Sequence, residues 1–449
     1  MPTALILLAA GQGTRMRSEL PKVLHEVAGA PLLSHALAAG MALAPERVVV
    51  VAGHGADLVR LVAEAEAPGA EVVLQAERRG TAHAVAQARG ALAGFEGDAL
   101  VLYGDTPFIR PETLRRMAEA RAGGADLVVL GFEAEEPGRY GRLVVEDDRL
   151  VRIVEHADAR PDELAIRLCN SGVVLADAAL LLDLVGAVGC GNAAGEFYLT
   201  DTVGIAVGRG LRAEVVTCDE SETLGVNSRA DLAAAEAAFQ DAARLRMLEE
   251  GVTLTAPATV HFSRDTALAA DVVVEPHVVF GPGVRVEGGA RVRAFSHLEG
   301  CVVEAGATVG PFARLRPGAR IGPGARVGNF VEIKAARIGD HAKVPHLSYV
   351  GDAEVGPRAN LGAGTVTCNY DGVSKHRTTI GEGAFIGSAT MLVAPVGVGA
   401  GALVGSGSVI TEDVPEGALA LARARQRTLP GRARAIWERL RAARAGGGA

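Results

Sequence analysis

Two glycines and two basic residues near the start of the chain have types and spacing that suit phosphate binding. Gly11 and Gly13 follow an apolar run in the segment LLAAGQGTRM (7–16), and glycine lets backbone N–H groups approach a phosphate closely. Arg15 in that segment and Lys22 in PKVLH (21–25) add positive charge. Methionine at position 16 excludes a G-x-G-x-x-G dinucleotide fingerprint. A plain strand-to-helix turn is the structural alternative, and the second cation favours a phosphate site.

An acidic residue ends another apolar run. Asp105 directly follows ALVLYG (99–104), where a carboxylate has few structural uses but is a good ligand for Mg²⁺. The segment QAERRGTAHA (75–84) likewise places polar residues after an apolar run. The structural alternative for Asp105 is the cap of a helix that begins near Pro107. The pattern therefore predicts a magnesium ligand close to the phosphate site.

The elements that position these residues follow from the alternation of apolar runs with helical segments rich in Ala, Leu, Glu and Arg. The predicted strands are Ala4–Leu8, Arg47–Val51, Glu71–Leu74, Ala99–Leu102, Leu127–Leu130 and Val173–Leu175. This alternation predicts an α/β Rossmann-like domain whose parallel sheet is covered by helices on both faces. Ligands of such sheets bind beyond the carboxyl ends of the strands, where the glycine segment and Asp105 fall.

An Ala-rich stretch at 230–250 is predicted to be a helix that links two domains. Ser228 is a suitable N-cap and Gly251 ends the stretch. One face of the predicted helix carries Leu232, Ala235, Phe239 and Ala242. Such a helix spans about 30 Å and would be a stiff connector. The alternative is that it is the last helix of the first domain.

From residue 251 onward, an aliphatic residue or Phe recurs about every six positions, with glycine and small residues between. The repeating residues are Leu268, Val274, Phe280, Val286, Val292, Leu298, Val303, Val309, Leu315, Ile321, Val327, Ile333, Ile338, Val344, Val350, Val355, Leu361, Ile380, Ile386, Leu392, Val398, Val404 and Ile410. A hexapeptide period predicts a left-handed parallel β-helix with one inward residue per hexad. Three hexads make one coil, so each inward residue stacks on the residue about 18 positions later.

Polar residues interrupt the hexads in one region. Lys334 lies beside an inward position in GNFVEIKAAR (328–337), and KVPHLSYVGD (343–352) carries His346 and Tyr349. The following segment is too long for one coil, so we predict an extruded loop at 370–379. A solitary histidine in a repeat protein is usually a solvated surface residue, but these polar neighbours favour a catalytic role.

These segments resemble the bacterial bifunctional N-acetylglucosamine-1-phosphate uridylyltransferase/glucosamine-1-phosphate N-acetyltransferase family. The motifs of the first domain occur in family order: LAAGxGTRM, PKxL, the Q…GT segment, YGDTP, RYGR (139–142), VEH (154–156), CNSG (169–172) and GVNSR (225–229). The second domain resembles the acetyltransferase half nearly residue for residue. The resemblance implies an enzyme that acetylates glucosamine 1-phosphate with acetyl-CoA. It then transfers UMP from UTP to N-acetylglucosamine 1-phosphate, which releases pyrophosphate and supplies UDP-N-acetylglucosamine for peptidoglycan and other envelope polysaccharides.

The resemblance also implies the residues of the uridylyltransferase site. UTP and the UDP-sugar would contact Leu8, Ala9, Ala10, Gly11, Arg15, Lys22, Gln75, Gly80, Thr81, Tyr103, Gly104, Asp105, Gly141, Glu155, Asn170 and Asn227. Asp105 and Asn227 would hold Mg²⁺, and Gln12 stands where some relatives have lysine. The attacking phosphate oxygen is already anionic, so this chemistry needs positioning and charge neutralisation rather than a general base.

For the acetyltransferase, the resemblance implies a site for the amino-sugar phosphate made of Arg316, Lys334, Tyr349 and Asn360. Acetyl-CoA would contact Ala363, Asn369, Tyr370, Ser388, Ser406 and Arg423, with Asn369 and Tyr370 also near the sugar. Ser406 replaces an expected alanine. His346 would be the base, because an ammonium group cannot attack a thioester until it loses a proton. The tail from Arg423 to Arg444 would pack on a neighbouring subunit of a homotrimer.

The composition of the chain indicates the cellular compartment in which the protein resides. The net charge of −8 disfavours binding to nucleic acid or to an anionic membrane. The five cysteines (169, 190, 218, 301 and 368) form no C-x-x-C pair and indicate free thiols in a reducing compartment. The N-terminal apolar run lacks a preceding basic region, which favours a buried strand over a signal peptide. No apolar stretch approaches the roughly 20 residues of a membrane span. We therefore expect a cytoplasmic protein.

The sequence thus predicts a uridylyltransferase domain at 1–229, a helical linker at 230–250, and a β-helix acetyltransferase domain with a C-terminal tail at 251–449. One alternative is another sugar-1-phosphate nucleotidylyltransferase, such as a glucose-specific enzyme, whose β-helix is regulatory. Lys334, His346 and Tyr349 weigh against it. The other is a non-enzymatic scaffold, and the presence of both Lys22 and Asp105 weighs against that.

Overall fold

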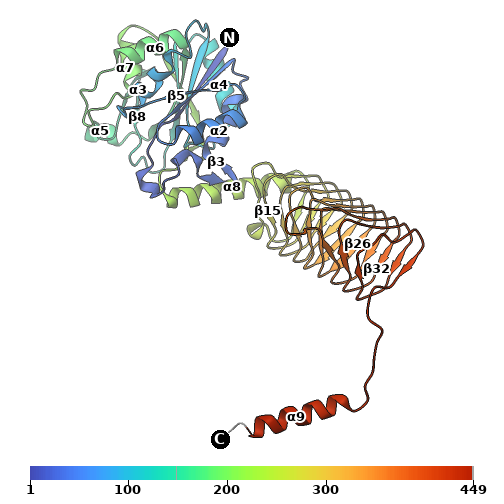
Figure 1. Ribbon diagram of the computed structural model, residues 1–449. Coiled ribbons are helices and arrows are strands. Elements are labelled where there is room, and N and C mark those ends of the chain that lie inside the picture. The colour runs from blue at the N-terminus through green and yellow to red at the C-terminus, as the bar shows by residue number, and fades with distance from the viewer. Residues whose placement is uncertain (148, 447–449) are drawn as a thin grey trace. The chain divides into compact units, whose positions relative to one another are not determined.

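The computed structural model describes residues 1–147 and 149–446, which form two compact units (Figure 1). The first unit comprises Met1–Leu245 together with Phe262–Arg264, and the second comprises Arg246–His261 and the chain from Asp265 onward. Within the described part of the chain, no helix has the length and apolar character needed to cross a membrane.

A twisted sheet forms the centre of the first unit. Its main strands, in spatial order, are β11 (Ala213–Cys218), β7 (Leu127–Glu133), β10 (Leu168–Asp177), β6 (Asp98–Tyr103), β1 (Thr3–Ala9), β4 (Arg47–Ala52) and β5 (Glu71–Leu74). Strand β1 is central, and both of its neighbours run parallel to it. The carboxyl ends of β1 and β6 therefore lie side by side, which places the glycine segment beside Asp105.

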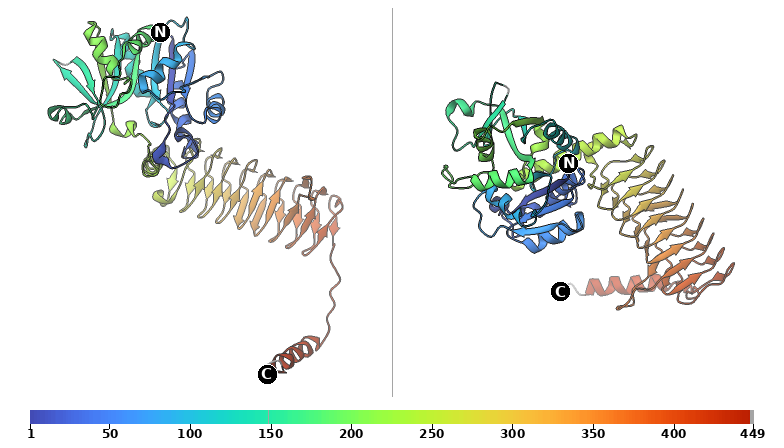
Figure 2. Two further views of the ribbon diagram at one scale, coloured as in Figure 1. Left: turned by 60° about the vertical axis from the view of Figure 1, so that its left-hand side comes forward. Right: turned by 90° about the horizontal axis from the view of Figure 1, so that it is seen from above.

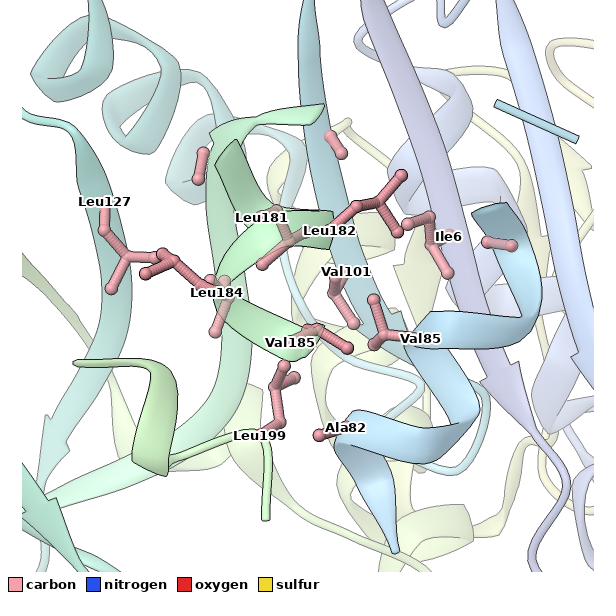
Figure 3. Close-up of a cluster of buried hydrophobic side chains, with 14 of the residues drawn as sticks. Ile6, Ala82, Val85, Val101, Leu127, Leu181, Leu182, Leu184, Val185 and Leu199 are labelled. Atoms are coloured by element: carbon pink, nitrogen blue, oxygen red, sulfur yellow. The ribbon is translucent and has the colours of Figure 1, made fainter. Parts of the chain in front are cut away.

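Helices cover both faces of this sheet (Figure 2). One face carries α1 (Leu32–Met41), α2 (Ala56–Glu66) and α4 (Pro111–Ala122), and the other carries α3 (Thr81–Ala86), α6 (Ala178–Ala187) and α7 (Asp201–Gly208). Successive residues of β1 alternate between the two cores: Leu5 and Leu7 pack beneath α1, and Ile6 faces the α3 and α6 side. Figure 3 shows that Ile6, Val85, Val101 and Val185 meet in this second core.

The sheet is mixed, and this corrects the prediction of a parallel sheet. Strand β10 runs antiparallel to both β6 and β7. The chain leaves β7, makes the antiparallel pair β8 (Arg142–Glu146) and β9 (Arg149–Val154), and returns through the single turn α5 (Pro161–Leu164). A parallel return needs a crossover, usually a helix of several turns, and this connection has none. The apolar runs predicted where the strands lie but not their direction.

Helix α8 (Arg229–Glu249) belongs mostly to the first unit. Ser228 caps it as expected: the Ser228 hydroxyl accepts from the Asp231 N–H at 3.2 Å, and the Asp231 carboxylate accepts from the Ser228 N–H at 2.9 Å. Ala235 and Phe239 pack against a cluster that includes Met16 and Val27. Ala242 is exposed instead of buried, because the apolar face continues through Ala243 and Met247, four residues apart.

The second unit is a parallel β-helix built from three sheets of very short strands (Figure 2). The first sheet contains β12 (Thr253–Leu254), β14 (Val273–Val274), β17 (Arg291–Val292), β20 (Thr308–Val309), β23 (Arg326–Asn329), β26 (Lys343–His346), β29 (Asn360–Leu361), β32 (Phe385–Ile386), β35 (Leu403–Val404) and β37 (Leu419–Ala420). The second contains β13 (Ala267–Leu268), β16 (Arg285–Val286), β19 (Val302–Val303), β22 (Arg320–Ile321), β25 (Arg337–Ile338), β28 (Ala353–Val355), β31 (Thr378–Ile380) and β34 (Val396–Val398). The third contains β15 (Val279–Phe280), β18 (His297–Leu298), β21 (Arg314–Leu315), β24 (Glu332–Lys334), β27 (Tyr349–Gly351), β30 (Val366–Cys368), β33 (Met391–Val393) and β36 (Val409–Ile410).

The hexad prediction is confirmed along the whole β-helix. Every predicted inward residue is buried, the most exposed being Leu268 at 8%. Leu298, Leu315 and Ile333 occupy equivalent positions in successive coils, as the strand register requires. The predicted extruded loop is also present, since the chain turns out of the coil after Asn369 and re-enters at β31. Beyond the last coil the chain continues to helix α9 (Arg432–Gly446).

The packing of α8 gives a prediction about where the chain can be cut. A fragment of residues 1–264 should melt at a higher temperature than a fragment of residues 1–229, because the shorter one lacks Ala235 and Phe239 and exposes Met16 and Val27. It also lacks Gln240, whose side chain bonds the N–H and C=O of Phe262 at 2.8 and 2.7 Å. We expect a difference of at least about 5 °C, since 1 kcal/mol shifts Tm by about 2–4 °C in a domain of this size. Circular dichroism melts of both fragments measure it, and equal Tm values would contradict the assignment of α8 to the first unit.

Candidate active sites

In the first unit, the Lys22 side chain contacts two side-chain oxygens from residues that are far apart in the sequence. Its ammonium forms an ion pair with the Asp105 carboxylate and donates to the Asn227 side-chain oxygen at 3.0 Å. Asp105 follows β6, Asn227 precedes α8, and the Val226 N–H donates to the Asp105 carbonyl at 2.9 Å to hold the two segments together. Asp105 is no helix cap, because the next helix, α4, begins only at Pro111. Two oxygens that converge on one cation form a position suited to positive charge.

The Asp105 and Asn227 pair fits a magnesium ion. Mg²⁺ in nucleotide enzymes is commonly held by one or two protein oxygens, with phosphates and water completing six ligands. Among the described residues no group of three or more His, Cys, Asp or Glu converges on a metal position. A metal at this pair would therefore depend on phosphate oxygens for the rest of its coordination shell.

A pocket opens beside this pair at the carboxyl end of β1. Its lining consists of Leu8, Ala10, Gly11, Lys22, Val23, Gln75, Arg78, Gly80, Thr81, Ala84, Tyr103, Asp105 and Glu196. The structure thus brings together most residues that the sequence predicted for the nucleotide, while Ala9 and Gly104 are buried behind the pocket wall. Arg78 and Glu196 were not predicted. Arg78 also donates to the Gln12 side chain, which brings a guanidinium to the position where some relatives have lysine.

Gln75 and Gly80 are fixed tightly in this pocket. Gln75 is 5% exposed, and its amide donates to the Gly80 carbonyl at 3.1 Å and contacts His83 Nδ1 at 3.0 Å. Gly80 has φ +111°, and a Cβ there would lie 2.4 Å from the Phe197 carbonyl oxygen. Glycine is therefore required at this position. The next residue, Thr81, accepts from the Leu199 N–H at 2.9 Å.

The predicted sugar contacts also gather at one place. The Asn170 N–H donates to the Gly141 carbonyl at 2.9 Å, and a Cβ on Gly141 would lie 3.5 Å from the Glu155 carboxylate. The register of β10 shifts between Asn170 and Val174, and Gly172 leaves space for the ring of Tyr103. Burial raises the pKa of the Tyr103 phenol well above its ordinary value, and the Asp105 and Glu155 carboxylates add to this shift.

Glu155 is held by a hydroxyl group. Burial raises the pKa of its carboxyl group, and the bond from the Thr200 hydroxyl to Glu155 Oε1, 3.0 Å long, acts in the opposite direction by favouring the charged form. Oε2 lies on the side of Gly141. A sugar hydroxyl that approaches from that side meets an acceptor whose orientation is already fixed.

In the second unit, two neighbouring coils place Asn329 beside His346. The two residues are register partners of β23 and β26, and His346 Nδ1 lies 2.6 Å from Asn329 Oδ1. An amide oxygen can only accept, so in the neutral imidazole this contact assigns the proton to Nδ1 and leaves the lone pair on Nε2. The sequence predicted His346 but not Asn329. Gly328, just before Asn329, permits the close coil contact, since a Cβ there would lie 1.9 Å from the Pro345 carbonyl oxygen.

Three cations of the second unit lie close to one another. Arg316 forms an ion pair with Glu332 at 2.8 Å, and Lys334 Nζ lies 3.7 Å from Asp352. The third is Lys375 of the extruded loop, and the adjacent Lys334 ammonium lowers the pKa of Lys375 because the two charges repel. This repulsion is relieved by an anion such as a phosphate. Lys375 was not predicted, because the loop lies outside the hexad register.

The other predicted residues of this site surround the cations or extend along the helix axis. Asn369 donates to Asp352 and lies 3.5 Å from the Tyr349 hydroxyl, which in turn passes over Gly351. Asn360 lies in β29, and Tyr370 is 60% exposed on the loop. Three contacts between successive coils form a line: Ala389 N–H to the Ala363 carbonyl, Gly407 N–H to the Ser388 carbonyl, and Arg423 to the Ser406 carbonyl. Four of the six predicted acetyl-CoA residues therefore lie along one line of successive coils: Ala363, Ser388, Ser406 and Arg423. Asn369 and Tyr370 lie where the loop leaves the coil.

Comparisons with known proteins agree with this two-part organisation. Residues 5–248 match the MobA-like NTP transferase domain family, and residues 300–335 match the bacterial transferase hexapeptide (six repeats) family. The chain is 62% identical over 449 residues to the bifunctional protein GlmU of Dinoroseobacter shibae, with both chains fully covered. It is 65% identical over 441 residues to the protein of that name from a strain of Cereibacter sphaeroides, which covers 98% of this chain and 97% of the relative. Roseobacter denitrificans has another at 60% identity over 445 residues, with 99% of each chain covered.

The hydrogen bond from the Thr200 hydroxyl to the Glu155 carboxylate gives a prediction for the first site. Thr200→Val removes the donor, so the pKa of Glu155 should rise further, because the charged form loses its hydrogen bond. A ¹³C NMR titration of the glutamate carboxyl groups in both proteins measures this shift. Thr259→Val, which changes a threonine of the second unit, serves as the control. An unchanged Glu155 pKa in the Thr200 variant would show that this hydroxyl does not stabilise the carboxylate.

Proposed function

This chain belongs to the family of the bifunctional protein GlmU, and from that premise we propose that its two units carry out two consecutive steps in the synthesis of UDP-N-acetylglucosamine. The second unit acetylates glucosamine 1-phosphate with acetyl-CoA. The first unit transfers UMP from UTP to N-acetylglucosamine 1-phosphate and releases pyrophosphate. The observation that carries this proposal is the presence, in one chain, of the Lys22–Asp105 ion pair beside the pocket of the first unit and of the His346 imidazole held by Asn329 in the second.

Uridylyl transfer needs charge neutralisation, and the first site supplies it. The sugar phosphate oxygen forms a bond to the α-phosphorus of UTP, and the bond to the bridging oxygen of pyrophosphate breaks. Asp105 and Asn227 would hold Mg²⁺, which when bound offsets phosphate charge. Lys22 brings a further cation to the same pocket, and Gln75 and Thr81 form its opposite wall. Glu155 and Asn170 would position the sugar, so that reactants meet at the correct geometry.

Acetyl transfer needs a base, and His346 fits that role. Its unprotonated Nε2 would take a proton from the ammonium group of the amino sugar, and the resulting amine attacks the thioester carbon. The new C–N bond forms, and the C–S bond breaks with its electron pair on the CoA sulfur. The nitrogen gives up its second proton, which the leaving thiolate takes up. Arg316, Lys334 and Lys375 would hold the sugar phosphate. Asn329 keeps the imidazole in the tautomer that this step requires.

An apolar row along one corner of the β-helix supports a homotrimer. The rings of His277, Phe295, Phe312 and Phe330 stack with centroids 4.8, 4.9 and 5.3 Å apart. Each backbone N–H of this row bonds to the coil before it, and the row continues to Leu347, which follows His346. Phe295, Phe312, Phe330 and Leu347 are 46–60% exposed. A second copy of the chain that covers this row would also close the site around His346. We place the protein in the cytoplasm, where its substrates and reduced cysteines belong.

Two variants test the two reactions separately. The purified protein with glucosamine 1-phosphate, acetyl-CoA, UTP and Mg²⁺ should yield UDP-N-acetylglucosamine, CoA and pyrophosphate, identified by mass spectrometry. Asp105→Ala should abolish nucleotide transfer and leave acetylation intact. His346→Ala should lower acetyl transfer by about 10²–10⁴-fold and leave nucleotide transfer intact. High pH should partly restore the His346 variant, because more of the substrate amine is then neutral without a base.

The control for the histidine is His297→Ala, which removes an exposed imidazole from β18 and should leave both activities unchanged. A His346 deficit that is the same at every pH would mean that the residue positions substrate rather than moving a proton. Nucleotide transfer to glucose 1-phosphate without any acetyl transfer would instead support a glucose-type enzyme with a regulatory β-helix.

A further inference from the structure

A second hollow adjoins the cation position of the first unit. It is lined by Arg15, Arg139, Tyr140, Gly225 and Asn227. Asn227 connects it to the nucleotide pocket, because its side chain accepts from Lys22, which lines that pocket. Within residues 1–147 and 149–446, neither Arg15 nor Arg139 forms a hydrogen bond or ion pair with another side chain or backbone group. Two guanidinium groups are thus available at the edge of the proposed reaction centre.

The loop that carries Arg139 is firmly held. Arg142 is 2% exposed, and its guanidinium donates inward to the carbonyls of Tyr140 and Gly138, the latter at 3.1 Å. The ring of Tyr140 packs edge-on against Phe132 with centroids 4.9 Å apart. Arg139, between these anchored residues, is exposed. The buried arginine therefore fixes the loop, and the exposed arginine is presented at the hollow.

Arg15 reaches the same hollow from the other side. It lies in the short turn Thr14–Met16, which begins at Gly13 with φ +62°. A Cβ on Gly13 would lie 2.6 Å from Lys22 Cβ, so this turn packs directly on the segment that carries Lys22. Met16 is buried, and its carbonyl accepts from Arg229 Nε at 3.2 Å. Both arginines are therefore carried by anchored backbone.

The charge in this hollow matches a group that the proposed reaction generates. When the sugar phosphate oxygen bonds to the α-phosphorus, the electron pair of the broken bond leaves on pyrophosphate, which gains negative charge. Arginine forks bind phosphate oxygens in pairs and cannot lose their charge. We propose that Arg139, together with Arg15, binds the pyrophosphate group, both as the β- and γ-phosphates of UTP and as the released product. The inference rests on the proposed uridylyl transfer and adds a pyrophosphate contact from the 137–141 loop.

The phosphate of the incoming sugar is the alternative anion that Arg15 and Arg139 could bind. Arg139 lies only two residues from Gly141 at the sugar site. Pyrophosphate is favoured because Arg15, the partner of Arg139 in the hollow, lies on the glycine segment whose Gly11 lines the nucleotide pocket. The two sources differ in which Michaelis constant a variant changes.

The test uses the full-length protein with Arg139→Ala, Arg139→Lys and the control Arg115→Ala, an exposed arginine on α4 paired with Glu112. In the reverse reaction, with UDP-N-acetylglucosamine and inorganic pyrophosphate, Arg139→Ala should raise the KM for pyrophosphate about tenfold. It should also raise the inhibition constant of pyrophosphate in the forward reaction by a similar factor. The pyrophosphate constants of Arg139→Lys should lie between those of the wild type and of Arg139→Ala, since lysine keeps the charge but lacks the paired N–H donors of the guanidinium group. The control should match the wild type.

Each other outcome has a defined meaning. Unchanged pyrophosphate constants in Arg139→Ala overturn the inference, and so does a rise in the KM for N-acetylglucosamine 1-phosphate alone, which would assign the hollow to the incoming phosphate. A circular dichroism melt of the full-length protein, with the transition of the first unit unchanged, reports that each variant is folded. A wild-type protein that makes no UDP-N-acetylglucosamine would refute the proposed function itself, which is distinguishable from failure of Arg139 alone.

Discussion

The spacing of successive coils in the β-helix is the constraint on which the second active site depends. Inward aliphatic residues stack from coil to coil, so every other position along the hexad is fixed relative to the coil before it. Asn329 and His346 are partners in that register, and this alone places an amide oxygen on Nδ1 of the exposed imidazole. Repetition of the core thus determines the chemistry at the surface.

In the first unit, strand pairing rather than coil register positions the residues of the candidate site. Parallel pairing of β1 with β6 brings two loops to one edge of the sheet, and the Val226 N–H, which donates to the Asp105 carbonyl, holds the neighbouring Asn227 close to Asp105. Lys22 neutralises the Asp105 carboxylate, which is only 19% exposed and would otherwise be costly to hold there without a partner. The Lys22 and Asp105 charges offset each other in the absence of substrate, so the site keeps a cation in place for a phosphate to meet. Gly80 fixes the backbone at the nucleotide pocket, and Arg142 fixes the 137–141 loop at the second hollow.

The sequence predicted those features that depend on local periodicity or on residue type at a strand end. Every residue that the hexads predicted to point inward is buried, and the strand-end rule located Asp105 and the glycine segment. Features that depend on pairing between distant segments were missed. The antiparallel direction of β10 leaves no trace in its apolar run, and Asn329 is one polar residue among many until the coil register pairs it with His346. Lys375 and Arg139 lie in loops, where no period applies, although Arg139 is the first residue of the RYGR motif. The site assignments for UTP, the sugar and acetyl-CoA remain proposals.

The proposed role of His346 as a base depends on the register between coils, and the Asn329→Ala variant tests this dependence. Without the acceptor, His346 is free to adopt the wrong tautomer, so kcat for acetyl transfer at neutral pH should fall about tenfold or more, while the KM for acetyl-CoA and nucleotide transfer stay unchanged. Asn329→Asp keeps an acceptor at the same place and should retain more of the activity than the alanine variant. An alanine variant with normal kcat from acid to alkaline pH would show that Asn329 does not orient His346, and would contradict the account.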